Sequence, residues 1–238
     1  MTRAQSHVIG VALLLGISVV ALGGLTLAVG SVVDSQTASA DATRVADGMA
    51  SALQPAATTG RRSGTVRFAD GTLSTAERDL RVRRNGTRVA TVGVDALVFE
   101  SGDRRVTFLA GAVVRGHSDN AWFRTDPLVT ASEQTGVVAV GAPRLGSDRI
   151  ARSASGPTAL TLGTNVSHTR RTLGSGRYTV ALETTTTGPF ARHFREHNAS
   201  VATRDIDGDG VPSVVATYSG VRTGYLVVHD LSLEVANG

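Results

Sequence analysis

The sequence contains one short acidic run whose spacing suits a metal ion. Asp205, Asp207 and Asp209 alternate with small or apolar residues, and two glycines in the run permit a tight turn. Alternate carboxylates of this kind wrap around Ca2+ at the start of an EF-hand loop. Counted from Asp205, however, the twelfth position is Ala216, where an EF-hand needs a bidentate glutamate. We therefore predict a partial, structural Ca2+ site and no other cofactor, with a metal-free Asp/Gly turn as the alternative.

A second group of polar residues has the spacing of a zinc peptidase motif. His193, Glu196 and His197 match the H-x-x-E-H pattern, in which two histidines on one helix face hold Zn2+ and the glutamate acts as a base. A third ligand would come from a downstream helix, whereas the only later glutamate, Glu234, falls in an expected strand. We therefore favour two exposed histidines flanking a buried Phe194, and we predict no catalytic residue.

Three asparagines lie in Asn-x-Ser/Thr sequences, which accept N-linked glycans on exported proteins. They are Asn85, Asn165 and Asn198. Asn85 is followed by Gly86, and this dipeptide also marks a hairpin turn without any glycan. We predict that at least one of the three is glycosylated. Chance is the alternative, because serine and threonine are plentiful.

Composition removes several kinds of chemistry. The chain has no cysteine, which excludes disulfides, thiolate zinc sites and a cysteine nucleophile. All 24 basic residues are arginine, so a phosphate-binding loop with its lysine is excluded, and no Gly-x-Ser-x-Gly motif is present. The formal net charge is only +4, and the arginines form small groups with acidic residues near several of them. We predict that the protein is not an enzyme and does not bind nucleic acid.

Most of the chain has the pattern of β-strands. Over residues 65–238, runs rich in Val, Thr, Leu and Phe are separated by turn residues about every ten positions. Asp70-Gly71 and Asn85-Gly86 are dipeptides typical of hairpin turns. The pattern predicts a mainly antiparallel, sandwich-like β domain. It is interrupted by one short helix near Gly188–His197, whose two phenylalanines share a face.

The N-terminal part is a long uncharged apolar run. Residues Val8–Val33 contain only three polar side chains, and as a helix they would be about 39 Å long. That length exceeds the roughly 30 Å hydrocarbon core of a bilayer. The run therefore predicts a hydrophobic helix able to cross a membrane.

The helix is expected to continue outward as an amphipathic segment. Val45, Met49 and Leu53 recur every four residues, which places them on one helix face, and Pro55 ends the helix. A short linker over residues 55–64 then leads to the β domain. Together these features predict an α+β protein, with a long N-terminal hydrophobic helix followed by a mainly antiparallel β head.

The first residues resemble the start of a known kind of precursor. Arg3 to Gly10, RAQSHVIG, followed at once by the apolar run, is similar to archaeal, and especially haloarchaeal, type IV pilin precursors. In that family a prepilin peptidase cuts ahead of the apolar segment. The resemblance implies cleavage between Ala4 and Gln5, so that residues 1–4 are a leader and residues 5–54 form the membrane and filament helix.

The resemblance implies a structural role. The protein would be a pilin-like subunit, and its large head favours a minor pilin, assembled into a surface filament for adhesion or a related role. Its partners would be other pilin subunits through the N-terminal helix, prepilin peptidase, the pilus assembly machinery and the membrane. It would sit single-pass in the cell membrane with the head outside, and then in the filament.

Other interpretations of the N-terminus stay open. The protein could be a membrane-anchored extracellular β domain that binds a ligand or glycan without polymerising. A signal peptidase cut near Ala38–Ala40 would instead release a secreted β domain. An anchored zinc hydrolase that uses His193, Glu196 and His197 is the third class.

Overall fold

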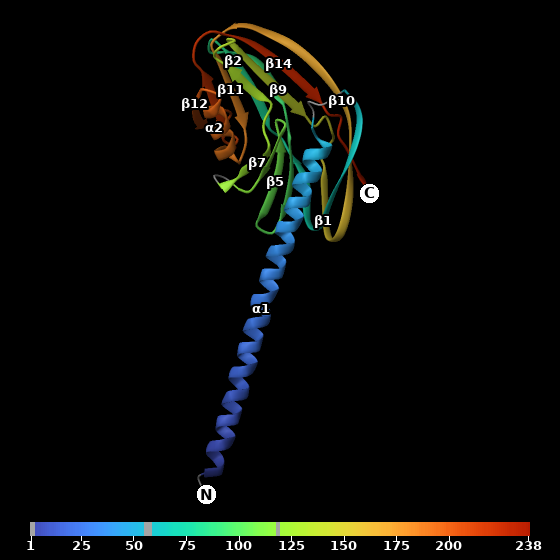
Figure 1. Cartoon of the computed structure of the whole chain (residues 1–238), viewed down its shortest axis with the longest axis vertical. Helices are drawn as coiled ribbons and strands as arrows, with labels where there is room; N and C mark the ends of the chain where they lie inside the picture. The colour runs from blue at the N-terminus through green and yellow to red at the C-terminus, as the bar shows by residue number, and fades with distance from the viewer. Residues whose placement is uncertain (1–2, 55–58, 118–119) are drawn as a thin grey trace.

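The structure is a computed structural model that describes residues 3–54, 59–117 and 120–238, without the side chains of residues 3–12, 24 and 26–34. The elements, in chain order, are α1 (Arg3–Ala52), β1 (Gly60–Ala76), β2 (Asp79–Arg84), β3 (Thr87–Gly93), β4 (Ala96–Ser101), β5 (Arg104–Leu109), β6 (Ala112–Arg115), β7 (Trp122–Thr125), β8 (Val129–Ser132), β9 (Val137–Arg144), β10 (Ala151–Gly176), β11 (Tyr178–Glu183), α2 (Thr187–Glu196), β12 (Ala199–Arg204), β13 (Ser213–Tyr218), β14 (Arg222–Asp230) and β15 (Glu234–Asn237). Figure 1 shows α1 projecting from a head made almost entirely of strands.

The prediction of an α+β fold is wrong, because the protein is mainly β. Strands dominate the described chain, and only the C-terminal part of α1 packs against the sheets. No helix within the described residues combines the length and the hydropathy that a membrane crossing requires. The prediction gave too much weight to the N-terminal helix, because it treated the apolar run as a structural layer of the fold. A layer must bury one face against another layer, and the described side chains of α1 between Leu13 and Leu25 are exposed.

Two sheets form the head. One has ten strands in the order β7-β6-β5-β4-β1-β10-β14-β9-β8, with β15 beside β10, and the other has the order β12-β13-β11-β2-β3. The pairings are antiparallel except that β14 and β9 are parallel. Apolar side chains from both sheets share one core, to which α2 adds Phe190 and Phe194. The two phenylalanines are fully buried, which confirms their predicted common face.

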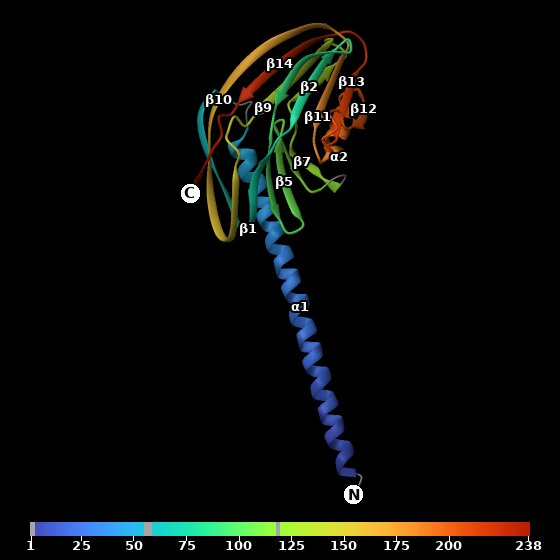
Figure 2. The ribbon, with the colours of Figure 1, turned by 180° about the vertical axis from the view of Figure 1, so that it is seen from behind.

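The two longest strands, β1 and β10, run beside each other and curve around the head (Figures 1 and 2). Asp70-Gly71, which the sequence predicted as a hairpin turn, lies inside β1. The β1–β10 register shifts between Phe68 and Asp70, so a bulge precedes the dipeptide, which itself pairs with β10. Gly71 has φ of 142°, and a Cβ there would lie 2.5 Å from the Glu100 carbonyl oxygen. Asn85-Gly86 does form the predicted turn, between β2 and β3.

The C-terminal part of α1 packs into a second core, between β1 and its neighbours. Ala42, Val45, Ala46, Met49 and Leu53 are almost completely buried there. This burial confirms the helix face predicted from the four-residue spacing. Close packing also explains two glycines at this contact. A Cβ on Gly48 would lie 2.8 Å from the Thr65 carbonyl oxygen, and a Cβ on Gly64 would lie 2.6 Å from the Cβ of Ala52.

One buried carboxylate fixes α1 to β1. Asp41 accepts hydrogen bonds from the backbone N–H groups of Ala69 (2.8 Å) and Asp70 (3.3 Å), and it pairs with Arg44. Burial by itself would raise the pKa of Asp41, but these hydrogen bonds and the Arg44 charge outweigh it and lower the pKa. The head thus holds the ionised carboxylate in place.

Candidate functional site

Charged side chains gather on the outer face of the five-stranded sheet. Side chains alternate between the faces of a strand, so Leu80 and Val82 of β2 enter the core while Arg81 and Arg83 face outward. Glu183, at the end of β11, lies opposite the first residue of β13. The loop that joins β12 to β13 is the acidic run of residues 205–210.

The fold brings three carboxylates together at this loop. One ligand oxygen from each of Glu183, Asp207 and Asp209 lies within 4.8 Å of the others. Glu183 is only 4% exposed, whereas the two aspartates are exposed. Oxygen donors at this spacing suit a hard cation such as Ca2+. This is the one such group of metal-binding side chains among the described residues.

Asp205 is not a member of this group. Its carboxylate accepts hydrogen bonds from the backbone N–H of Gly208 (2.8 Å) and of Gly210 (3.1 Å), and so it shapes its own loop. The structure therefore brings together two of the three predicted metal-binding aspartates and replaces the third with Glu183. Glu183 was not predicted as a ligand because it lies more than twenty positions before the loop, and only strand pairing places it beside the aspartates.

Arg81 supplies positive charge to the same group. Its Nη2 lies 3.0 Å from Asp79, 3.3 Å from Glu183 and 2.5 Å from Asp207. Burial raises the pKa of Glu183, as do the negative charges of Asp209 and Asp207, while the Arg81 charge opposes them. The cluster is thus an ion-pair network that is partly compensated by arginine. A cation would have to compete with Arg81.

The zinc-like motif on α2 is used for packing. His193 is 6% exposed, so the expectation that both histidines are exposed is wrong for this one. Its Nε2–H donates to the Val129 carbonyl oxygen (3.0 Å), and the His197 Nδ1–H donates to the His193 carbonyl oxygen (2.9 Å). Glu234 lies in β15, which pairs with β10 of the other sheet. Within the described residues these groups therefore do not converge on a metal position.

The three glycan-acceptor asparagines are all exposed, but their surroundings differ. Asn85 uses its Oδ1 to accept a hydrogen bond from the Arg177 backbone N–H (2.9 Å). Asn165 lies on β10, and Asn198 follows α2 with φ of 59°. Glycosylation of these sites stays a prediction.

The predicted cleavage position is at the start of the chain. Ala4 and Gln5 fall in the first turn of α1, and their side chains lie outside the described part of the structure. The cleavage prediction therefore stays a prediction.

These features define a mainly β head on an N-terminal helix, with a charged loop on the outer face of one sheet. The sequence matches the family described as "Family of unknown function (DUF7289)" over residues 3–234. The match spans nearly the whole chain, and the protein belongs to this family. No curated protein and no solved structure matches the chain.

Proposed function

We propose that the protein is a pilin-like structural subunit, a minor pilin by the size of its head, that assembles into a surface filament through α1. The observation that carries the proposal is the exposed apolar surface of the part of α1 that projects from the head (Figures 1 and 2). Leu14 is 67% exposed and Val20 is 76% exposed. Burying a large aliphatic side chain contributes about 1.5–3 kcal/mol, so several together favour association strongly.

The distribution of these side chains favours packing on all sides. Leu13, Leu14 and Leu15 are consecutive and point to different sides of the helix, and all three are exposed. A helix that is apolar all round is one that other helices or lipid surround. A single docking groove would cover only one of its faces. Several neighbouring copies of the same helix, as in a filament core, would cover all of them.

Small residues on the same segment support close helix contacts. A Cβ added at Gly16 or Gly23 would have no described atom within 4 Å. Within the described part of the subunit these glycines therefore serve no packing need. At a contact between helices, small residues let two backbones approach closely.

In this proposal the subunit passes through two environments. The precursor resides in the cell membrane with its head outside, prepilin peptidase cuts it between Ala4 and Gln5, and the assembly machinery moves it into the filament. The second candidate is a membrane-anchored protein that binds a ligand with its head and does not polymerise. A pocket on the outer face of the five-stranded sheet, lined by arginines that include Arg83, Arg88 and Arg204, favours some ligand binding and is compatible with either candidate.

The test compares filament formation by the full chain and by surface variants in its native host. Ile17→Ser with Val20→Ser makes the projecting helix more polar, and Val221→Ser, on the head and 69% exposed, is the matched control. We expect filaments in the sheared surface fraction from the unchanged protein and the control, and none from the double variant. Equal unfolding temperatures of the heads would show that the variants fold. Filaments from the double variant, or none from the unchanged protein, would overturn the proposal.

A further inference from the structure

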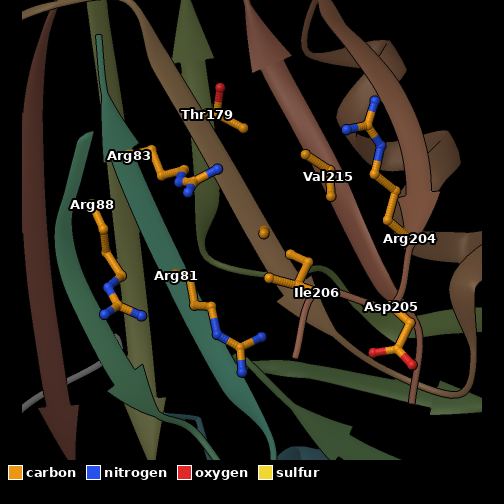
Figure 3. A pocket seen from close by; sticks show the side chains of 9 residues that line it. Arg81, Arg83, Arg88, Thr179, Arg204, Asp205, Ile206 and Val215 are labelled. Atoms are coloured by element: carbon orange, nitrogen blue, oxygen red, sulfur yellow. The ribbon is translucent and has the colours of Figure 1, made fainter. Parts of the chain in front are cut away.

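A pocket of about 310 Å3 opens on the outer face of the five-stranded sheet, next to the acidic loop. Figure 3 shows Ile206 in the middle of it, arginines of β2 and β3 on one side and Arg204 on the other. Between them lie Thr179 of β11 and Val215 of β13. Small side chains on the two central strands thus leave a hollow between long arginine side chains on the outer strands.

The strand register places two of these arginines directly opposite each other. Arg83 of β2 pairs with Arg88 of β3 on one side and with Thr179 of β11 on the other. Like charges that face each other across neighbouring strands destabilise a sheet. This pair has no compensating acid, because neither arginine has an ion-pair partner among the described residues.

The acids near the pocket are already engaged. Arg204 too lacks an ion-pair partner within the described chain. Asp205, the one carboxylate that lines the pocket, accepts hydrogen bonds from backbone N–H groups of its own loop. Arg81, the fourth arginine of the lining, differs because Asp79, Glu183 and Asp207 surround its guanidinium. Three arginines without an ion-pair partner in the described structure therefore line one small hollow, and Asp205 is the one acid beside them.

We propose that this pocket binds a small acidic ligand that carries at least two carboxylate or sulfate groups. A guanidinium binds such an oxyanion through two parallel hydrogen bonds, which fixes its orientation. Because arginines stand on both sides, one oxyanion group would bind Arg83 and Arg88, and a second would bind Arg204. The carbon skeleton between them would lie over Ala181 and Val215.

The size and lining of the pocket narrow the ligand class. About 310 Å3 is at the lower end of pockets that take small molecules. No aromatic side chain lines it, so it offers no surface on which a nucleic-acid base would stack. The inference is independent of filament assembly, since the pocket is on the head and α1 contributes nothing to its lining.

The test is calorimetric titration of the full chain, in a neutral detergent, with citrate and with acetate at low salt. We expect citrate to bind at least ten times more tightly than acetate, because only citrate reaches both sides. Arg88→Gln and Arg204→Gln should each weaken citrate binding about tenfold, since each removes charge-assisted hydrogen bonds from one side. Both side chains are exposed and lack an ion pair in the described structure, so the variants should unfold at the temperature of the unchanged protein.

Arg170→Gln provides the control, because Arg170 is exposed on β10 of the other sheet. It lowers the net charge by the same amount and should leave citrate binding unchanged. Three results would overturn the proposal. They are no citrate binding at about 10 mM, equal weakening in the Arg170→Gln control, and an effect of Arg88→Gln without one of Arg204→Gln.

Discussion

The two ends of α1 differ in how their apolar side chains are arranged and covered. Near the head, the apolar side chains lie on one stripe that includes Val45 and Met49, while Arg44 and Asp47 face solvent. The head itself covers that stripe. Farther out, between Leu13 and Leu25, the described side chains other than Ser18 are apolar and exposed, and no described part of the chain covers them. An amphipathic helix can bury its apolar face against its own subunit, whereas a helix that is apolar all round requires other molecules to bury its remaining faces.

A substitution in the end of α1 that packs into the head should have the largest effect on stability. Met49 is fully buried between α1 and β1, and Met49→Ala would leave a cavity in the second core. We expect the free energy of unfolding to fall by about 3 kcal/mol. Leu14→Ala, on the projecting end, should change it by less than about 0.5 kcal/mol. Denaturant unfolding of both variants checks this, and equal losses would show that the two ends do not differ.

Acid should destabilise the head through a histidine pair on β10 and β14. The Nδ1 atoms of His168 and His229 lie 2.8 Å apart on β10 and β14. Burial, and then the His168 and Arg170 charges, lower the pKa of His229 to about 4. The folded state therefore resists protonation, so stability is complete above the usual histidine pKa and is lost as the pH falls towards about 4.

We expect a loss of about 2 kcal/mol over that pH range, measured by unfolding at several pH values. His229→Gln should unfold with a much weaker pH dependence. Filaments should remain intact under mild acid, because the pair is on the head and takes no part in the projecting end. An unchanged pH dependence in His229→Gln would refute the role of this pair.

The Asp41 carboxylate, which fixes α1 to β1, should contribute somewhat less to the free energy of unfolding than the histidine pair does. Asp41→Asn removes the charge that binds Arg44 and the Ala69 N–H, and we expect a loss of about 1.5 kcal/mol at neutral pH. The folded state lowers the pKa of Asp41, so this contribution is present at neutral pH and is lost as the pH falls through the lowered pKa. Unfolding curves from neutral pH to pH 3 should therefore converge for the two proteins. A constant difference would contradict the assignment.

Calcium binding should have the smallest effect on the free energy of unfolding, and the effect should be confined to the head. If the acidic cluster binds Ca2+, a concentration ten times the dissociation constant adds about 1.4 kcal/mol to the free energy of unfolding. Asp209→Asn should abolish that gain. Asp148→Asn is the matched control and should keep it, because Asp148 is exposed and lies outside both the cluster and its loop. No response of the unchanged protein to millimolar Ca2+ would leave the cluster as an arginine-compensated network alone.

Local spacing predicted part of this molecule well. The four-residue repeat of Val45, Met49 and Leu53 and the pair Phe190 and Phe194 identified buried helix faces, because a helix face depends only on positions a turn apart. Asn85-Gly86 likewise identified a turn from two residues.

Features that depend on distant parts of the chain were not predicted. Asp70-Gly71 lies within a strand because β1 continues past it to pair with β4, and the dipeptide has no local mark of that pairing. His193 is buried because α2 lies over β8, and Glu183 joins the acidic loop only through the β11–β13 register. The arginine pocket likewise requires all five strands of the smaller sheet to be placed side by side.

The most direct test of the central claim is the N-terminal residue of the protein in filaments sheared from native cells, read by terminal mass spectrometry. Processing between Ala4 and Gln5, followed by assembly through α1, predicts a chain that begins at Gln5. A chain that still begins at Met1 or Thr2, or one that begins beyond Ala38, would contradict assembly through the processed N-terminal helix.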